Sequence, residues 1–413
     1  MKNLVMGTGN GYDWYTFEPF VNSFLKNSSE NTDLVLFVSN ISRFTENKLN
    51  GGGRVKLEPF PEKIKGAAPA VNRWKLFLDY VNKHGSDYNQ ILISDTRDVI
   101  FQDDVFKYFT KYNHYLGNTI EGDNIRGEKA GIYINYIWIN EVFGKSEADK
   151  LADKPIICCG TVIGTPEEIK IYIEKLWQYK GNHKTHGVDQ ATHQYIFYNN
   201  LLPIENLIEI DCTTGAIFTS YLFNVLNPIQ VKNNMILRGD GGVPAVVHQY
   251  DRHQQLVQLV DNLYREKIFQ ADENFTDIQS ALDQVFCLVQ RQNWSTATKF
   301  FIDYVFYAED LNSYSEKLLK LAQFILQRYN PDAEILFSAA QTTLAIAFSS
   351  NIDINQMEKI YNLFIQAENF KCVNSSFKFF VKSMLINFTD VLYRNNQQIL
   401  AREYIKRLAD WRD

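Results

Sequence analysis

The apolar residues of the chain change their pattern at about residue 249, and this change limits the fold that each part can adopt. Before it, apolar runs of strand length at 4–6, 34–38 and 90–94 alternate with segments of helical periodicity such as 71–83. Such alternation is typical of an α/β domain. With 413 residues and 45% hydrophobic content, the chain is long enough for more than one core.

The second part reads as helical throughout. Residues 254–413 contain one proline, Pro331, and no clear strand alternation. Helical periodicity predicts helices at 256–268, 278–291, 297–308, 315–328, 332–348, 356–364, 377–393 and 398–411. Their short connections favour antiparallel pairs, as in a helical bundle or an irregular α-solenoid, since no regular repeat of about 34 residues is present. We therefore predict an α/β domain over 1–253 and an all-α domain over 254–413.

A polar cluster, Asp95-Thr96-Arg97-Asp98, directly follows the apolar strand at 90–94. Ligands of open α/β sheets bind beyond the carboxyl ends of strands. Two carboxylates there suit a hard divalent cation, and the arginine fork suits phosphate oxygens. The cluster therefore predicts a site for Mn²⁺ or Mg²⁺ that holds a diphosphate. The simpler alternative is a solvated strand end with a helix cap.

This segment resembles the metal-binding Asp-x-Asp region of GT-A-fold glycosyltransferases, and the resemblance covers about residues 1–255. It implies a Rossmann-like mixed sheet flanked by helices. A strict Asp-x-Asp triplet is absent. If Asp95 matches the first acid, Arg97 occupies the second position, whereas if Asp98 matches the second acid, Thr96 occupies the first. Both aspartates therefore remain candidate metal ligands.

Two further residues gain candidate roles from the same resemblance. His248 ends the last predicted strand, 245–248, and is the third candidate ligand, which gives a donor set suited to Mn²⁺. Asp189 lies in a segment similar to a short helix start whose acid faces the sugar, so it is the candidate catalytic residue. Its alternative role is a helix N-cap. His183 and His186, just before it, could contact phosphate or acceptor.

The resemblance also implies where the nucleotide sugar binds. The loop after the first strand would meet base and ribose, and a basic residue before the metal strand would face the diphosphate. The glycine segment 159–164, read here as short strand pieces around Gly160, would shape the sugar pocket. The candidate nucleotide-sugar ligands are Thr8, Gly9, Tyr12, Arg73, Asp95, Arg97 and Gly160. The plain alternative for Arg73 is a surface arginine.

Together these features imply a glycosyltransferase that moves a sugar from a nucleotide-diphosphate sugar to a hydroxyl of a glycan, lipid-linked or protein acceptor. The His248 arrangement favours retention of configuration. One alternative is a glycoside hydrolase with two carboxylates, which needs no metal. Another is a non-catalytic carbohydrate- or protein-binding module with a degenerate GT-A domain, because the Asp-x-Asp triplet is irregular.

Composition excludes several other classes. A net charge of −6 gives no basic face for nucleic acid. The five cysteines lack zinc-site spacing and are expected to be free thiols, as in a reducing cytosol. No apolar run approaches the roughly 20 residues of a membrane span, and the N-terminus does not read as a signal peptide. We expect a cytoplasmic protein, with peripheral membrane association left open, whose helical domain serves a protein partner or a second copy.

Overall fold

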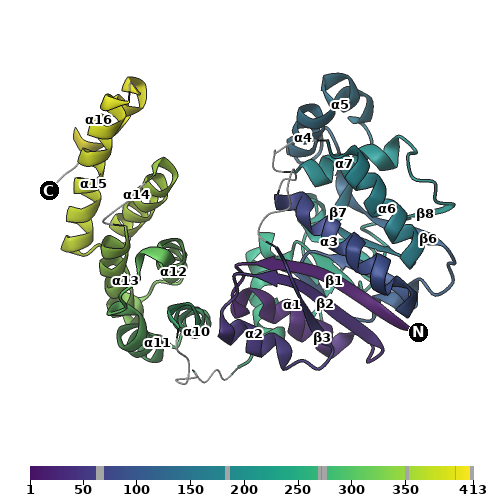
Figure 1. Ribbon diagram of the computed structural model, residues 1–413, viewed down its shortest axis with the longest axis horizontal. Coiled ribbons are helices and arrows are strands. Elements are labelled where there is room, and N and C mark those ends of the chain that lie inside the picture. The colour runs from purple at the N-terminus through teal and green to yellow at the C-terminus, as the bar shows by residue number, and fades with distance from the viewer. Residues whose placement is uncertain are drawn as a thin grey trace. The chain divides into compact units, whose positions relative to one another are not determined.

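The computed structural model describes residues 1–61, 69–181, 187–267, 271, 277–348, 353–395 and 397–409 (Figure 1). The chain divides into two compact units. The first comprises Met1–Ile41 and Thr45–Lys267, and the second Ser42–Phe44 and Ile268–Asp413. The first unit is built on a mixed sheet with helices, and the elements after residue 277 are helices. The predicted fold class, an α/β part followed by a helical part, is therefore confirmed.

A seven-stranded mixed sheet with the order β3-β2-β1-β4-β7-β6-β8 forms the framework of the first unit. Its strands are β1 Lys2–Asn10, β2 Thr32–Ser39, β3 Val55–Pro59, β4 Tyr88–Ser94, β6 Tyr115–Asn124, β7 Pro155–Gly164 and β8 Asn206–Ile210. The strands β1 to β4 pair in parallel. Strand β7 is antiparallel to both of its neighbours, β4 and β6. The segment around Gly160, expected as short pieces, is thus one continuous strand.

Helices cover both faces of this sheet. The helices within residues 1–267 are α1 Trp14–Asn27, α2 Arg43–Asn50, α3 Pro69–His84, α4 Ile134–Phe143, α5 Lys145–Leu151, α6 Pro166–Tyr179, α7 Val188–Tyr198, α8 Ser220–Leu226 and α9 Gln254–Tyr264. On one face, Leu4 and Met6 share a hydrophobic cluster with side chains of α3, α6 and α7. The alternate residues Val5, Leu34 and Leu92 point to the opposite face and are also fully buried. Both faces are therefore shielded from water.

A second, three-stranded sheet has the order β5-β12-β9, formed by Val99–Phe101, Val246–His248 and Ile217–Thr219. Strand β12 pairs antiparallel with β5 and parallel with β9. The short strands β10 (Gln230–Lys232) and β11 (Met235–Leu237) form a separate hairpin. Since β5 follows β4 after only four residues, the small sheet brings the end of β12 to the carboxyl end of β4.

The first unit extends beyond the expected boundary at 253, because α9 packs on α1. The side chain of Asn22 donates to the Tyr264 carbonyl at 2.7 Å, and the Tyr264 hydroxyl donates to the Phe101 carbonyl at 3.1 Å. Helix α9 also buries three of its side chains completely or nearly so. The first unit consequently ends at Lys267.

The second unit is a succession of packed helices. They are α10 Ile278–Gln290, α11 Trp294–Phe301 with the π-helical turn Ile302–Phe306, α12 Ser315–Gln327, α13 Glu334–Ala347, α14 Ile354–Asn369, α15 Ser375–Arg394 and α16 Gln398–Ala409. Helix α10 packs on α11, α12 on α13, and α15 on α16, and helices two apart in the sequence, such as α10 and α12, are also in contact. The side chain of Asp353 caps α14 in a capping box with Gln356. Within the described residues, no helix combines the length and apolar character needed to cross a bilayer.

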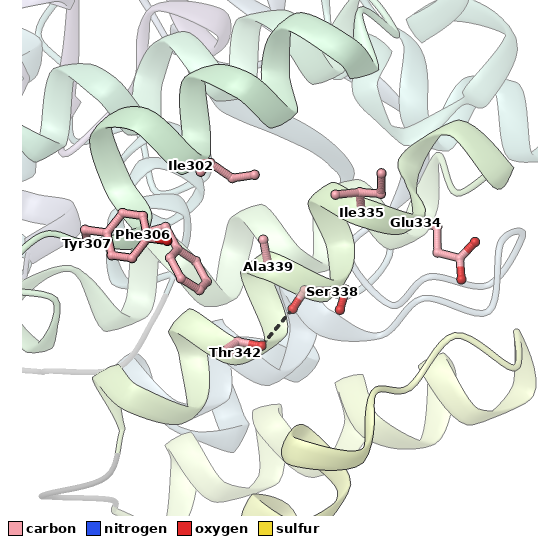
Figure 2. Close-up of a pocket in the computed structure, with 8 residues that line it drawn as sticks. All are labelled: Ile302, Phe306, Tyr307, Glu334, Ile335, Ser338, Ala339 and Thr342. Atoms are coloured by element: carbon pink, nitrogen blue, oxygen red, sulfur yellow. Dashed lines mark hydrogen bonds between the residues drawn. The ribbon is translucent and has the colours of Figure 1, made fainter.

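The second unit contains a hollow of about 500 Å³ between the π-helical turn and α13, shown in Figure 2. It is lined by apolar side chains such as Ile302, Phe306 and Ile335, with Glu334 as its acidic group. In α13 the Thr342 hydroxyl donates to the Ser338 carbonyl at 3.1 Å, which satisfies that polar side chain within its own helix. The lining brings together no set of acids and histidines that could carry chemistry.

Candidate active site

Asp95, Asp98 and His248 form one cluster in which a ligand atom from each residue lies within 4.8 Å of the others. Both aspartates lie in the turn between β4 and β5, and His248 is the last residue of β12. The antiparallel register of β12 and β5 places His248 opposite Val99, directly beside Asp98. The geometry therefore brings together the three residues that the sequence proposed as metal ligands.

Backbone contacts from three strands fix the turn that carries the two aspartates. The Asp95 amide donates to a carbonyl of β7 at 2.7 Å, and the Thr96 hydroxyl donates to the Thr8 carbonyl of β1 at 2.6 Å. The amide of Gln249, which follows β12, donates to the Asp98 carbonyl at 2.7 Å. These hydrogen bonds hold the turn that carries both carboxylates.

The cluster contains a buried nitrogen that has no hydrogen-bond partner. His248 Nε2 lies 3.5 Å from Asp95 Oδ2 and 3.7 Å from Asp98 Oδ1 but bonds to neither, although His248 is 1% exposed. Its Nδ1 lies 3.5 Å from Cys158 Sγ, and with Nδ1 protonated, Nε2 carries the lone pair. A Cβ on Gly160 would lie 2.5 Å from His248 Cε1 and 2.6 Å from Asp95 Oδ2, so the glycine keeps this space open.

The electrostatics of the cluster suit a cation. Burial alone would raise the pKa of the Asp95 carboxyl, but Arg73 and His248 outweigh it and hold that pKa below its usual range. Burial alone would lower the pKa of His248, but the carboxylates of Asp95 and Asp98 outweigh it and raise that pKa. Two carboxylate oxygens and one imidazole nitrogen form a donor set that fits Mn²⁺ or Mg²⁺.

Arg73, from α3, connects this cluster to Asp189. Its Nη1 donates to Asp95 Oδ1, and its Nη2 donates to Asp189 Oδ2 at 2.9 Å. Only 15% of the Arg73 side chain is exposed, so it is not a surface arginine. Burial opposes its charge, but the two carboxylates outweigh burial and hold the pKa of Arg73 well above its ordinary value.

Asp189 lies in the first turn of α7, whose N-cap is Gly187 rather than Asp189. Its Oδ1 accepts the amide of Gln190 at 3.0 Å. The Gln190 side chain accepts from the Cys159 amide at 2.9 Å and donates to the Ile157 carbonyl at 2.6 Å. Gln190 therefore fixes the start of α7 to β7 and with it the position of Asp189.

A cavity of about 650 Å³ in the first unit is lined by most of these residues, whereas Asp98 is not part of its lining. The sequence-derived candidates that line it are Thr8, Tyr12, Arg73, Asp95, Gly160, Asp189 and His248. Gly9 is placed elsewhere, under the Phe17 ring, where a Cβ would overlap that ring. Arg97 is half-exposed and pairs with Asp98 at 3.4 Å and Asp251 at 3.3 Å. His183 and His186 lie outside the described residues.

The cavity is also lined by residues that were not among the predicted site residues. Glu121, from β6, lines it while nearly buried, and burial raises the pKa of its carboxyl. Arg252 lines it with Nη2 3.6 Å from Asp98 Oδ2. Helix α4 contributes Asn135 and Trp138. The only sequence signal for Arg252 was its position shortly after His248, and Glu121 gave no local signal.

The cysteines near the cavity are not suited to act as nucleophiles. All five cysteines of the chain are unpaired. Cys158 and Cys159 are buried, and burial raises the pKa of each thiol well above its usual value. Since the thiolate is the nucleophile, neither is a candidate for covalent catalysis.

No family model and no curated protein matches the chain. Solved structures with a similar fold include the galactosyltransferase LgtC in complex with donor and acceptor sugar analogues, at 15% identity and a TM-score of 0.36, over 64% of this chain and 97% of that one. An active-site mutant of LgtC matches at 14% and 0.36, over 76% and 99%. The bifunctional glycosyltransferase WbbM in its apo form matches at 9% and 0.40, over 63% and 50%. These likenesses are too distant to assign an activity to this chain.

Proposed function

We propose that the first unit is a GT-A-type glycosyltransferase that moves a sugar from a nucleotide-diphosphate sugar to an acceptor hydroxyl, with Mn²⁺ or Mg²⁺ as cofactor. One observation carries the proposal. The ligand cluster of Asp95, Asp98 and His248 is joined through Arg73 to Asp189. All of these residues except Asp98 line a single cavity. A diphosphate needs a cation at its oxygens, and the attached sugar needs a polar group beside it. The ligand cluster would supply the cation, and Asp189 would supply the polar group.

Asp95, Asp98 and His248 would hold the metal ion. When bound, the ion would stabilise the negative charge that develops on the leaving diphosphate. Arg73 is already paired with two carboxylates, so its role here is to position Asp95 and Asp189. Arg252 lines the same cavity and is better placed to contact a phosphate oxygen.

The remaining candidate residues take roles around the sugar and the nucleotide. Asp189 would accept a hydrogen bond from a sugar hydroxyl or take the acceptor proton, and the resemblance to GT-A enzymes favours the first role and retention of configuration. Its Oδ2 pairs with Arg73 and its Oδ1 accepts the Gln190 amide, so the orientation of the carboxylate is fixed. Thr8 and Tyr12, from the end of β1 and the loop after it, would contact the base and ribose.

Thermal unfolding with nucleotide diphosphates and metal tests the proposal. UDP or GDP together with Mn²⁺ should raise Tm by about 5 °C, and neither component alone should do so, because ligand at about 100 times Kd stabilises by about 2.7 kcal/mol. Asp98→Ala and His248→Ala should each abolish this increase. Asp79→Ala, which removes an exposed carboxylate from α3, is the matched control and should keep it. A donor-hydrolysis screen with nucleotide sugars and Mn²⁺ then identifies the sugar.

If the nucleotides stabilise equally without metal, or Asp98→Ala and His248→Ala retain the metal-dependent shift, the proposed site is wrong. A metal-dependent shift without any donor hydrolysis or transfer would instead indicate a sugar-nucleotide-binding module.

A further inference from the structure

One face of α4 is apolar and exposed beside the candidate active site. We call this the α4 face and define it by Ile132, Tyr133, Ile134, Ile137 and Trp138. Tyr133, Ile134 and Ile137 are 57%, 38% and 43% exposed. Ile132, Ile134 and Trp138 also line the cavity. The α4 face is therefore a continuation of the cavity wall onto the outer surface of the first unit.

Contacts place the α4 face next to Asp189 rather than at the ligand cluster. Gly187, the N-cap of the helix that carries Asp189, packs against the Trp138 ring, and a Cβ there would overlap it. Asn135 of α4 accepts a hydrogen bond from Gln190 Nε2 at 3.3 Å. Asp189 therefore lies in the chain between two residues that contact α4.

Hydrogen bonds and two glycine turns fix the segment that leads into α4. The nearly buried Asp123 accepts the amides of Lys129 at 3.2 Å and Ala130 at 2.8 Å. Gly127 and Gly131 adopt left-handed backbone conformations at φ values of 72° and 71°, and the Gly131 amide donates to the Gly127 carbonyl at 2.8 Å. The apolar side chains that follow are presented to solvent on a fixed backbone.

We infer that the α4 face binds the apolar part of the glycosyl acceptor, an alkyl or prenyl chain attached to the sugar that is extended. The inference rests on the proposed function, since it names the acceptor class of that site. Isoleucine side chains cannot form hydrogen bonds with a saccharide. They can bury the apolar surface of a hydrocarbon chain, which is favourable in water. Ile134 and Trp138 belong both to the lining of the cavity that contains Asp189 and to the α4 face. The chain of an acceptor whose sugar is bound beside Asp189 would therefore lie on the α4 face.

Other occupants fit the surroundings less well. A protein or a second copy seated on Ile134 and Trp138 would cover residues that line the cavity and so obstruct the acceptor's approach. An anionic membrane surface is recognised by basic amphipathic helices, but α4 contains no Lys or Arg. An uncharged hydrocarbon chain matches both the apolar character of the face and its place at the cavity rim.

Binding of a matched pair of glycosides tests the inference. The probes are octyl β-D-glucopyranoside, below its critical micelle concentration, and methyl β-D-glucopyranoside, each titrated calorimetrically into the full chain. The octyl glycoside should bind at least about 10-fold more tightly, because apolar burial grows with each CH₂. Tyr133→Ser/Ile137→Ser, which changes exposed side chains only, should remove this preference. Val225→Ser/Val231→Ser, at exposed apolar positions outside the cavity lining, should keep it.

Equal affinity of the two glycosides for the native chain, or an unchanged preference in the α4 double variant, would overturn the inference. Loss of binding to vesicles of phosphatidylglycerol and phosphatidylethanolamine in that variant, without a glycoside preference, would assign the face to a membrane instead. Conversion of a dimer to a monomer in light scattering would assign it to a second copy. The Mn²⁺-dependent shift with UDP or GDP is measured in parallel, so failure of the proposed function is seen separately from failure of the alkyl preference.

Discussion

Arg73 satisfies two carboxylates with one side chain, and this pairing decides how the candidate site holds its shape. Its guanidinium donates to Asp95 and to Asp189, which come from different elements of the first unit. Two carboxylates that share one cavity repel each other unless a cation lies between them. The flat, forked guanidinium can donate to both at once, whereas an ammonium group is a single point of charge.

Replacing Arg73 should therefore destabilise the protein. Arg73→Met should lower the free energy of unfolding by about 2–4 kcal/mol, because breaking a largely buried pair leaves an uncompensated charge, reduced here by the part-exposure of Asp95. Arg73→Lys should lose less. Urea unfolding measures both. Lys75→Met, which breaks an exposed pair with Asp79 on the same helix, is the control and should change stability by less than about 0.5 kcal/mol. Equal effects of Arg73→Met and Lys75→Met would contradict this account.

His193 should make stability depend on acid pH. It is buried beside the Tyr172 hydroxyl, 2.8 Å from its Nδ1, and burial together with the charge of Arg73 lowers its pKa from 6.5 to about 3. The unfolded chain takes up a proton here as pH falls below 6.5, whereas the folded chain does not until about pH 3. The free energy of unfolding should therefore decrease as the pH falls from about 6.5 to about 3.

Urea unfolding at pH 7, 6, 5 and 4 checks this, with His193→Gln for comparison. The variant should show a weaker dependence on pH over that interval, whatever its stability at pH 7. An identical slope for the variant and the native chain would show that other groups cause the acid loss.

At the scale of elements, the antiparallel direction of β7 shapes the site as much as any side chain. Ser94, the last residue of β4, is paired with Thr161 of β7, so the Asp95 amide reaches the Gly160 carbonyl. The missing side chain of Gly160 then leaves room beside His248. The sheet order therefore explains why a glycine stands at this position of an otherwise bulky strand.

Gly160→Ala should impair metal binding while the fold is retained. The added Cβ would lie 2.5 Å from His248 Cε1 and 2.6 Å from Asp95 Oδ2, so both candidate ligands must shift from their present positions. We expect the Mn²⁺-dependent rise in Tm to be lost, as measured by thermal unfolding with and without Mn²⁺. Gly51→Ala, where a Cβ meets only backbone oxygens at 3.5 and 3.7 Å, is the control. An unaltered metal response in Gly160→Ala would argue against a cation between these residues.

Elements with a regular apolar pattern could be predicted from the sequence. The strand at 90–94 is visible as a short apolar run, and helices such as 278–291 are visible from the helical spacing of their apolar residues. Strand β6 could not be predicted, because its buried positions include Asn118, Thr119 and Glu121. Tertiary contacts override local preference there, and Glu121 was overlooked for that reason.

The proposed metal ligands could be predicted because they lie near strand ends. Asp95, Asp98 and His248 follow or end apolar runs, and a resemblance to known enzymes connected them. The pairing of Arg73 with Asp189 could not be predicted, since it joins residues 116 positions apart on two helices. Local periodicity gives no information on which helices will face each other.

At the scale of the molecule, the chain consists of two units of different construction, and α9 closes the first. Leu256, Val260 and Tyr264 of this helix are buried within the first unit. Arg265, just after it, pairs at 3.2 Å with Glu18, which is fully buried. The α/β unit is therefore complete only when the chain has passed residue 265.

Two fragments test this boundary. The fragment 1–267 should be soluble and unfold cooperatively, whereas 1–253 should not. Loss of α9 removes the burial of three apolar side chains, about 5 kcal/mol, which is comparable to the whole stability of many domains. Thermal unfolding followed by circular dichroism checks both. A cooperative transition of 1–253 within about 3 °C of that of 1–267 would contradict the assignment of α9, since so small a shift corresponds to only about 1 kcal/mol.

The position of β7 in the sheet also affects the protein while it is being made. Strands β1 to β4 can pair once Ser94 has left the ribosome, but the second neighbour of β4 begins only at Pro155. During translation of the residues between them, the nascent sheet has an open edge with unpaired amides and carbonyls, where a strand of another nascent chain can add. Slower synthesis prolongs this interval, so slow translation and a low chaperone supply should both reduce the yield of folded protein.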